Sequence, residues 1–411
     1  MKTFLTILSL LVFTQIQAQL EQPNRFEIIQ KYNDAEFTVV SLEREGLALF
    51  RGTDQYKDRM RSWQVMLLDT TLQTKLDTLV TIEKEYTLIG YEYTAGTLSL
   101  LFQSGEFIKD KISLCDINLK NFNINIYNIK TELELKLAYF SRLQNSVVFA
   151  GYINSEPAIV MYDLEKSKAQ MVPGFLQRNT ELMDLRVNLN ATFNVIMVEK
   201  ISGQNKKIIF RTYDAHAKLL LEDMIETEGS NTVFNAISSN LYRDDLLLMG
   251  TWGRRTSDRA LGFYTTLVNP FEEQKTQLAQ FGSLQHYLDY LKPRRADKIK
   301  TKTKAALLAG KVYEFTNNAI PYKMIEHHAG FIVLAETYAP NSNPNNFYNN
   351  PSFNQPWNSP YYPYNPYYPR YGISRQYQPL SYGQNVTPEE IEIKTYSSSL
   401  LFVNEKGVIE N

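Results

Sequence analysis

Residues Ser146–Gly174, SVVFAGYINSEPAIVMYDLEKSKAQMVPG, have the pattern of strand, turn, strand, turn and strand. Val147–Gly151 is a short apolar run and Ala158–Asp163 alternates apolar and polar residues, and both patterns are typical of β-strands. Asn154–Pro157 supplies a turn between them, because proline fixes φ and asparagine tolerates tight backbone conformations. Leu164–Lys168 then reverses the chain into a third strand. Variants of this unit recur along most of the chain, which predicts a repeat of one small sheet.

An Asp or Asn ends an apolar strand in each unit: Asp69, Asn118, Asp163, Asp214, Asn269 and Asn404. Such a side chain can accept a hydrogen bond from the backbone two residues on, as a hairpin requires. The first five are spaced 49, 45, 51 and 55 residues apart. The last gap is 135 residues, and it returns to 55 once two insertions, 282–311 and 338–387, are removed. A period near fifty with four short strands is typical of a β-propeller blade.

The spacing therefore predicts an all-β fold, a six-bladed β-propeller with four-stranded blades over residues 19–411. The expected blades are 34–82, 84–130, 131–174, 180–226, 230–281 and the part from Glu314 onward. A β-sandwich or an open run of hairpins is the alternative. Arg25–Gln30 is expected to be a lone strand. Either it closes the ring by pairing with the sixth blade, or the sequence is part of a longer one.

Residues 1–18 have the pattern of a signal peptide. Lys2 is the positive start, Phe4–Phe13 is the apolar core and Ala18 is the small residue before the expected cleavage. The apolar core is shorter than the ~20 residues that span a bilayer, and no other stretch is apolar enough, so no transmembrane segment is expected. We expect an exported chain that is periplasmic, outer-membrane-associated or extracellular.

The composition is that of an ordinary globular protein. The 411 residues are 44% hydrophobic, and the formal net charge of −1 gives no reason to expect nucleic-acid binding. Cys115 is the only cysteine, so no intramolecular disulfide can form. It lies in an apolar run, which favours a buried, inert thiol. An exported chain without disulfides suits a bacterial source.

The fifty-residue, four-strand units resemble a β-propeller over roughly residues 34–411. The Gln-Ala-Gln end of the leader and the Asn/Tyr-rich loop are similar to those of exported proteins of Bacteroidota. The Gly-His and Trp-Asp pairs of WD40 repeats and the double glycine of kelch repeats do not occur. The resemblance therefore implies the fold and the compartment only, and no residue role comes with it.

The first insertion, 282–311, is predicted to be helical. Ser283 is a plausible N-cap, and an apolar stripe follows at helical spacing. Pro293 interrupts this helix or starts a second one, and Gly310 can end it. Seven Lys or Arg and one acid, Asp297, lie between residues 292 and 304. Such a run is either a solvated helix face or a docking site for an acidic partner. The stripe consists of Leu284, Tyr287, Leu288 and Leu291.

The second insertion, Tyr338–Thr387, is a low-complexity tract of Asn-Pro and Pro-Tyr-Tyr-Pro units. It cannot build its own core, so it is either a disordered loop or an aromatic platform for sugar rings or protein surfaces. Its candidate binding residues are Trp357, Tyr361, Tyr362, Tyr367 and Tyr368.

Catalytic, metal and cofactor motifs do not occur in the sequence, so no catalytic residue, metal ligand or cofactor is predicted. His327 and His328 are expected on opposite faces of a strand, which keeps them from one metal. The polar residues Asp184, Arg186, Glu326 and His328 are expected on innermost strands that line the channel. Hydrogen-bonded structure is the simpler interpretation, and a glycan-active enzyme with two channel carboxylates is the alternative function.

Connectivity indicates where a binding face lies. Because the strands of a blade alternate in direction, the loop between the second and third strands lies on the same side as the connection to the next blade. The insertion 282–311 is such a connection, and the insertion 338–387 is such a loop. The fifth-blade loop 250–260 carries the candidate binding residues Trp252, Arg254, Arg255 and Arg259. The first-blade loop 51–63 carries Arg51, Tyr56, Lys57, Arg59 and Arg61. We expect an exported, non-catalytic binding or scaffold protein whose partner is an acidic protein surface or a carboxylated glycan.

Overall fold

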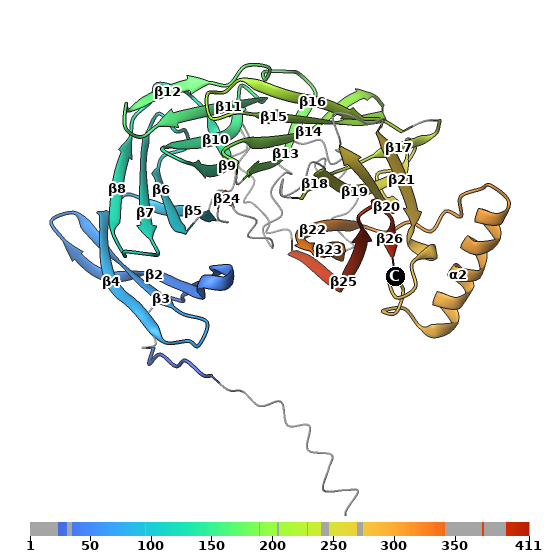
Figure 1. Cartoon of the computed structure of the whole chain (residues 1–411), viewed down its shortest axis with the longest axis horizontal. Helices are drawn as coiled ribbons and strands as arrows, with labels where there is room; N and C mark the ends of the chain where they lie inside the picture. The colour runs from blue at the N-terminus through green and yellow to red at the C-terminus, as the bar shows by residue number, and fades with distance from the viewer. Residues whose placement is uncertain are drawn as a thin grey trace, which may run out of the picture. The chain divides into compact units, whose positions relative to one another are not determined.

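Over the residues that it describes, the computed structural model is nearly all β-structure with one α-helix (Figure 1). It describes residues 24–30, 35–94, 96–188, 190–203, 205–227, 229–239, 246–268, 274–341, 372–373 and 392–410. The signal peptide predicted at residues 1–18 lies outside the described residues. The chain divides into two compact units, residues 1–84 and 85–411.

The first unit holds one antiparallel sheet, sheet A, in the strand order β1-β2-β3-β4. The loop expected at 51–63 is instead mostly strand, because β2 and β3 continue to a two-residue turn at Asp58 and Arg59, both with positive φ. Arg61 lies over the rings of Tyr56 and Trp63 in this hairpin. The strands are β1 (Thr38–Ser41), β2 (Leu47–Lys57), β3 (Met60–Leu68) and β4 (Thr74–Glu83).

Arg25–Gln30 does not form the lone strand that the sequence predicted. Phe26 and Ile28 pack instead against the face of sheet A made by Leu49, Met66 and Leu68. The apolar side chains of this segment therefore bury surface against a sheet face of the first unit.

The second unit holds five further sheets, B to F, each with four main strands in sequence order. Sheet B is β5 (Thr87–Thr94), β6 (Thr97–Ser104), β7 (Lys111–Asn118) and β8 (Ile124–Ile129). Sheet C is β9 (Lys136–Leu143), β10 (Ser146–Ile153), β11 (Glu156–Asp163) and β12 (Lys168–Met171). Sheet D is β13 (Thr180–Val187), β14 (Phe193–Ser202), β15 (Asn205–Tyr213) and β16 (Leu219–Ile225).

The first strand of sheet E is divided into two parts, β17 (Asn231–Val233) and β18 (Ile237–Ser238). Both parts pair antiparallel with the next strand of the sheet, β19. It continues with β19 (Leu246–Arg254), β20 (Ala260–Val268) and β21 (Lys275–Gln280). Sheet F is β22 (Ala319–His327), β23 (Gly330–Asn341), β25 (Glu392–Asn404) and β26 (Ile409–Glu410). The six predicted blades thus correspond to six four-stranded antiparallel sheets, and the fold is all-β and propeller-like.

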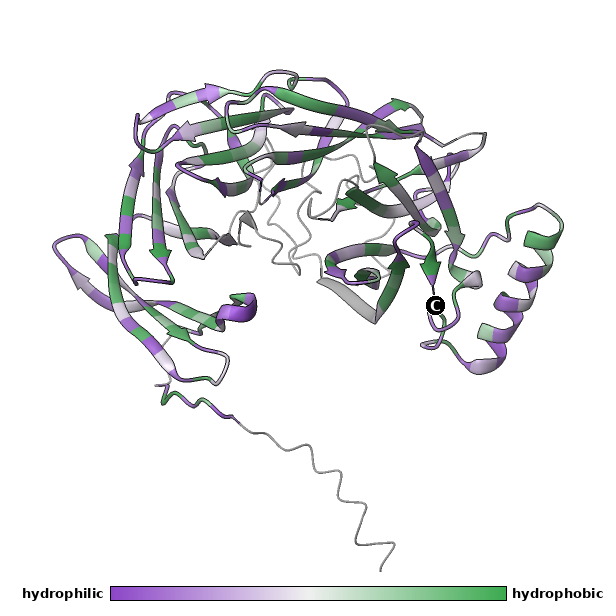
Figure 2. Ribbon diagram, in the orientation of Figure 1, coloured by the Kyte–Doolittle hydropathy of each residue, from purple (hydrophilic) through white to green (hydrophobic). Residues whose placement is uncertain are grey.

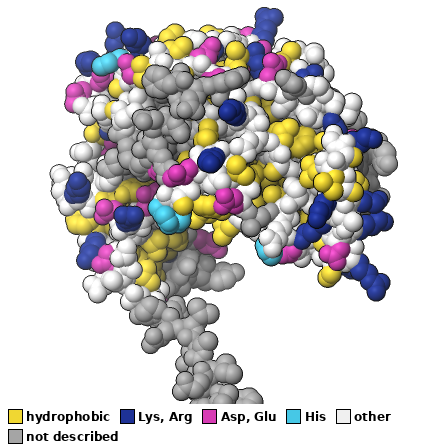
Figure 3. Space-filling model, turned by 45° about the vertical axis from the view of Figure 1, so that its right-hand side comes forward, with side chains coloured by type: hydrophobic (Ala, Val, Ile, Leu, Met, Phe, Trp, Pro, Cys, Tyr) yellow, Lys and Arg dark blue, Asp and Glu magenta, His cyan; other side chains and the backbone are white. Residues whose placement is uncertain are grey.

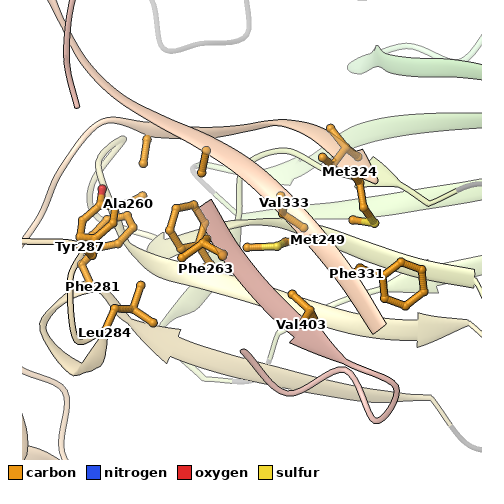
Figure 4. Close-up of a cluster of buried hydrophobic side chains, with 14 of the residues drawn as sticks. Met249, Ala260, Phe263, Phe281, Leu284, Tyr287, Met324, Phe331, Val333 and Val403 are labelled. Carbon is orange, nitrogen blue, oxygen red and sulfur yellow. The ribbon is translucent and has the colours of Figure 1, made fainter. Parts of the chain in front are cut away.

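Consecutive sheets of the second unit share their cores. Strands that are apolar on both faces, such as β10 and β14, can face a neighbour on either side. Phe149 lies in a cluster with sheet B, and Val148 on the other face lies in a cluster with sheet D. Sheets D and E share a third cluster around Phe210 and Trp252. Figure 4 shows the fourth, in which Phe263 of sheet E meets residues of sheet F.

The first insertion is helical only in its second half. Phe281–Ser283 is one 3₁₀ turn (η2), the residues to 292 form irregular turns, and α2 runs over Pro293–Leu308. Proline at the first helical position and Gly310 at positive φ after its end match the predicted boundaries. The helix expected over the apolar stripe is wrong, yet Leu284, Tyr287 and Leu288 are buried, because they enter the core between sheets E and F.

The tract predicted at 338–387 begins inside β23, and most of it lies outside the described residues. Gly372–Ile373 is described as a short strand, β24, and it pairs with Gly90 and Tyr91 of β5. Trp357, Tyr361, Tyr362, Tyr367 and Tyr368 all lie outside the described residues.

Candidate functional site

The connections of sheets B to F divide between two sides of the second unit, as the sequence predicts. In sheet B, the loop after the second strand bonds the connection to the next sheet, from Ile108 N to Leu135 O at 3.0 Å. In sheet C the same relation joins Leu176 N to Pro157 O. In sheet E, Arg255 N bonds Ser230 O. We call this the decorated side, because the first long insertion belongs to it and the second begins there, where Tyr338 N bonds Asn318 O of the connection between sheets E and F.

The opposite side, here called the turn side, consists of short hairpins closed by the recurring Asp and Asn residues. The Asp163 carboxylate accepts the N–H groups of Glu165 and Lys166, at 3.0 and 2.9 Å. Asn118 and Asp214 bond the backbone of their turns in the same way. Asp69 does so in the first unit, and Asn404 does so in sheet F. Asn269 lies outside the described residues.

The predicted arginines of sheet E hold a loop in place. Arg254 Nη1 donates to Ser230 Oγ and Asn231 Oδ1, at 2.6 and 2.9 Å, and its Nε lies 3.4 Å from Glu314. Arg255 donates to two backbone carbonyls of residues 227 and 231. Arg254 and Arg255 therefore join the decorated-side connections of sheet E, while Arg259 is exposed on the same loop.

Trp252 is a core residue. It is 1% exposed, and its indole Nε1 donates to Ala279 O at 3.3 Å. The position belongs to β19, which is buried along eight of its nine residues, so the ring cannot stack on a surface ligand. The prediction that Trp252 is a binding residue is therefore wrong, because its side chain is buried in the core.

Helix α2 carries the densest group of cations on the decorated side (Figure 3). It buries Ala296, Ile299 and Thr303, which lie three and four residues apart and face the protein. Its remaining surface is mostly hydrophilic (Figure 2). The exposed cations are Arg294, Arg295, Lys298, Lys302 and Lys304. Lys302 lies over the Tyr313 ring, 5.6 Å from its centroid.

A half-buried carboxyl, Glu181, and a buried amine, Lys206, lie near the decorated side of sheets D and E. Burial raises the pKa of Glu181 to about 7, although Lys206 and Lys200 oppose the shift. Burial also lowers the pKa of Lys206, which is 3% exposed and lies 5.7 Å from the Phe234 ring centroid. Each group is desolvated and stabilises the charge of the other. Sequence reasoning missed the pair because its members come from strands 25 residues apart.

A cavity of about 820 Å³ opens beside this pair. Its wall includes Glu181, Val198 and Lys200 of sheet D and the turn at Asn154 of sheet C. Arg178 and Glu156 form an ion pair at 3.4 Å on the same wall. The size is that of a small-ligand site, and the wall offers charges of both signs beside apolar side chains.

A second buried carboxyl joins sheets B and C. Burial raises the pKa of Glu92 to about 7, while bonds from Ser141 and from Arg142 N oppose the shift. Arg142 Nε in turn pairs with Asp116 at 2.8 Å. Ser99 Oγ donates to the other Asp116 oxygen. Both acids of this network, Glu92 and Asp116, have hydrogen-bond partners inside the protein. The network therefore links sheets B and C.

The polar residues that the sequence placed on innermost strands lie in the first strand of sheet D or at and directly after the end of the first strand of sheet F. Asp184 is buried, and its Oδ2 lies 3.9 Å from Arg186. His328 lies in the turn after β22, so alternation along a strand does not apply to it, and its ring centroid is 3.9 Å from that of His327. The prediction that the two rings lie on opposite faces is therefore wrong. The described residues contain no group of three metal-ligating side chains. Cys115 is buried, and burial raises the pKa of its thiol to about 12.

Among the described residues, no helix is long and apolar enough to cross a membrane. No family model and no curated protein matches the chain. A mutant of the Synechocystis apocarotenoid oxygenase resembles it at TM-score 0.33 and 7% identity, over 60% of this chain and 64% of that one. Prolyl oligopeptidase B from Galerina marginata has a TM-score of 0.39 at 10% identity, over 74% and 39% of the two chains.

An acylaminoacyl peptidase of Pyrococcus horikoshii has a TM-score of 0.32 at 10% identity, over 47% of this chain and 32% of that one. The chain thus spans less than two thirds of the length of the solved proteins named here. Likeness at this level says nothing about an activity.

Proposed function

We propose that this chain is an exported, non-catalytic binding or scaffold protein that contacts a protein or a glycan through its decorated side. One observation carries the proposal: α2 is fixed on that side by a buried face and presents five cations outward. The described part of the turn side consists of short hairpins, in which Asp163 and Asp214 accept hydrogen bonds from the backbone of their own turns. Functional residues concentrate on loops that a rigid scaffold holds, which favours the decorated side.

The proposal includes a six-bladed ring. Support comes from the near-constant spacing of the Asp and Asn caps and from the shared cores of consecutive sheets B to F. It also includes export, supported by the apolar run Phe4–Phe13 and by Ala18. Mass spectrometry of the chain from its native host tests export. A mature N-terminus at Gln19 is expected, and an intact Met1 chain in the cytoplasm would overturn this part.

Two ligand classes remain within the proposal, and each has its own contact surface. The cations of α2 suit an acidic surface, and the cavity beside Glu181 has the volume of a small-ligand site, so it suits a sugar. The test immobilises the mature chain and screens it against an acidic peptide set and a glycan array. Two variants accompany it: Arg259→Ala on the sheet E loop and Glu181→Gln in the cavity wall.

The expected result is saturable binding to one class that a decorated-side substitution weakens at least fivefold, with the melting temperature kept. Binding that is instead lost only when turn-side residues are changed, such as Lys120 and Lys218, would contradict the proposal. A bound sugar or peptide that the chain converts to product would contradict its non-catalytic part.

A further inference from the structure

We propose that α2 is a docking helix for an acidic protein surface that also offers an apolar contact. The inference rests on the proposed function, and it names the partner class of one surface. Its first support is the set of unused cations. Among the described residues, the side chains of Arg294, Arg295, Lys298 and Lys304 have no hydrogen-bond or ion-pair partner. Asp297 is the one acid within the helix.

The position of these cations along the helix opposes its own stability. Arg294 and Arg295 occupy the first turn, where the positive end of the helix dipole disfavours positive charge, and this turn contains no acid. The last turn, where cations would be favoured, contains none. A stable helix would have the reverse pattern. Cations in the first turn that gain no stabilising contact inside the protein are expected where these residues serve a function.

The helix is held rigidly, so it can present these charges in a fixed arrangement. Its buried face packs so closely on η2 that a Cβ at Gly282 would lie 2.1 Å from Thr303 Oγ1. Lys300 Nζ donates to Gln285 O and lies 3.8 Å from Asp289. These contacts fix one side of the helix and leave the other side to solvent. Ordering the helix therefore adds little to the cost of binding.

The apolar residues of the helix distinguish between anionic partners. The face with Ala296 and Ile299 is turned inward, so the helix cannot lay an apolar face into a lipid surface. Leu307 and Leu308 at the C-terminal end are 50% and 83% exposed. Phosphate backbones and sulfated sugars offer nothing apolar to this pair. A protein surface with acidic side chains beside an apolar patch satisfies both features.

The test measures binding of a fluorescent sixteen-residue peptide of alternating Glu and Leu by anisotropy at 150 mM salt. A 20-base-pair duplex, a heparin oligosaccharide and vesicles of phosphatidylglycerol and phosphatidylcholine are the competing probes. The binding variant is Arg294→Glu, Arg295→Glu, Lys298→Glu. The matched control is Lys120→Glu, Lys218→Glu, Lys406→Glu, which makes the same charge change in exposed turns on the turn side. A third variant is Leu307→Ser, Leu308→Ser.

The proposal predicts that the helix variant weakens peptide binding at least tenfold and keeps or raises the melting temperature, since the acids now suit the helix dipole. The leucine variant is expected to weaken binding at least threefold, and the turn-side control is expected to change it less than twofold. Equal loss in the control, or no loss in the leucine variant, would overturn the inference. Stronger α2-dependent binding to the duplex, heparin or vesicles would also overturn it.

Different outcomes would overturn this inference and the proposed function. If the peptide does not bind but a glycan binds through the Glu181 cavity, the inference is wrong and the proposed function stands. If binding depends only on turn-side residues, both are wrong.

Discussion

A Cβ at Gly282 would lie 2.1 Å from Thr303 Oγ1 and 2.9 Å from Thr303 Cβ. The glycine of η2 thus lets α2 approach the core between sheets E and F. Gly282→Ala is expected to destabilise the fold by about 1–3 kcal/mol, because a methyl group must be forced into a packed contact.

Urea unfolding of Gly282→Ala and of the double variant with Thr303→Ala checks this prediction. The second substitution removes the nearer atom and should restore part of the lost stability. Gly282→Ala with parent stability, or with no gain from the second change, would show that α2 can move away from the core without cost.

Buried Glu92 makes the fold less stable as the pH rises. Its pKa is about 7 in the folded chain, raised by burial from the ordinary 4.5. Below pH 4.5 the carboxyl is protonated in both states, so it costs nothing. Between pH 4.5 and pH 7 the unfolded chain has lost the proton while the folded chain keeps it, so about 3 kcal/mol of stability is lost over this range.

Glu92→Gln should therefore gain stability relative to the parent between pH 5 and pH 8, by about 2–3 kcal/mol. Glu132→Gln, at an exposed position, controls for the loss of one carboxylate. Urea unfolding at the two pH values is the measurement. The prediction is wrong if the parent and Glu92→Gln differ by the same amount at both pH values.

The Asn and Asp caps of the turn side should contribute to stability through their acceptor oxygens. Asn118 Oδ1 accepts the N–H groups of Lys120 and Asn121, at 2.9 and 3.2 Å. Asn118→Ala leaves both donors to water, and we expect a loss of about 1 kcal/mol. Asn118→Asp keeps an acceptor oxygen and should stay near the parent value. Thermal unfolding distinguishes the two, and equal melting temperatures for Ala and Asp would contradict the role.

Trp252 should affect stability and leave binding unchanged. Trp252→Phe loses the bond to Ala279 O and part of the contact between sheets D and E, for about 1–3 kcal/mol. Arg259→Ala changes an exposed side chain, so its stability should be that of the parent. Calorimetric unfolding beside peptide or glycan titration checks both. A Trp252→Phe variant with parent stability and lost binding would reverse this assignment.

The sequence predicts the sheets well because the information is local. Asp163 and its counterparts close turns that need an acceptor two or three residues away, so their spacing alone marks the units. Pro293 likewise marks the start of α2. The chain path through these elements then places their connections on two sides.

Features that depend on contacts between distant residues could not be predicted. Trp252 lies in a loop-like sequence beside Arg254, and only the pairing of β19 within sheet E shows it to be buried. The stripe with Tyr287 has helical spacing, yet its side chains enter the core from irregular turns. Glu181 and Lys206 come together through strand pairing and burial between sheets D and E, which a single sequence does not encode locally.

Site-specific photocrosslinking in the native host tests whether the chain binds its partner through the decorated side. Benzoylphenylalanine replaces Lys298 of α2 in one strain and Lys120 of the turn side in another, both exposed positions. We expect a discrete adduct from position 298 that disappears with Arg294→Glu and Arg295→Glu, and none from position 120. Adducts of equal yield from both positions, or from position 120 alone, would contradict it.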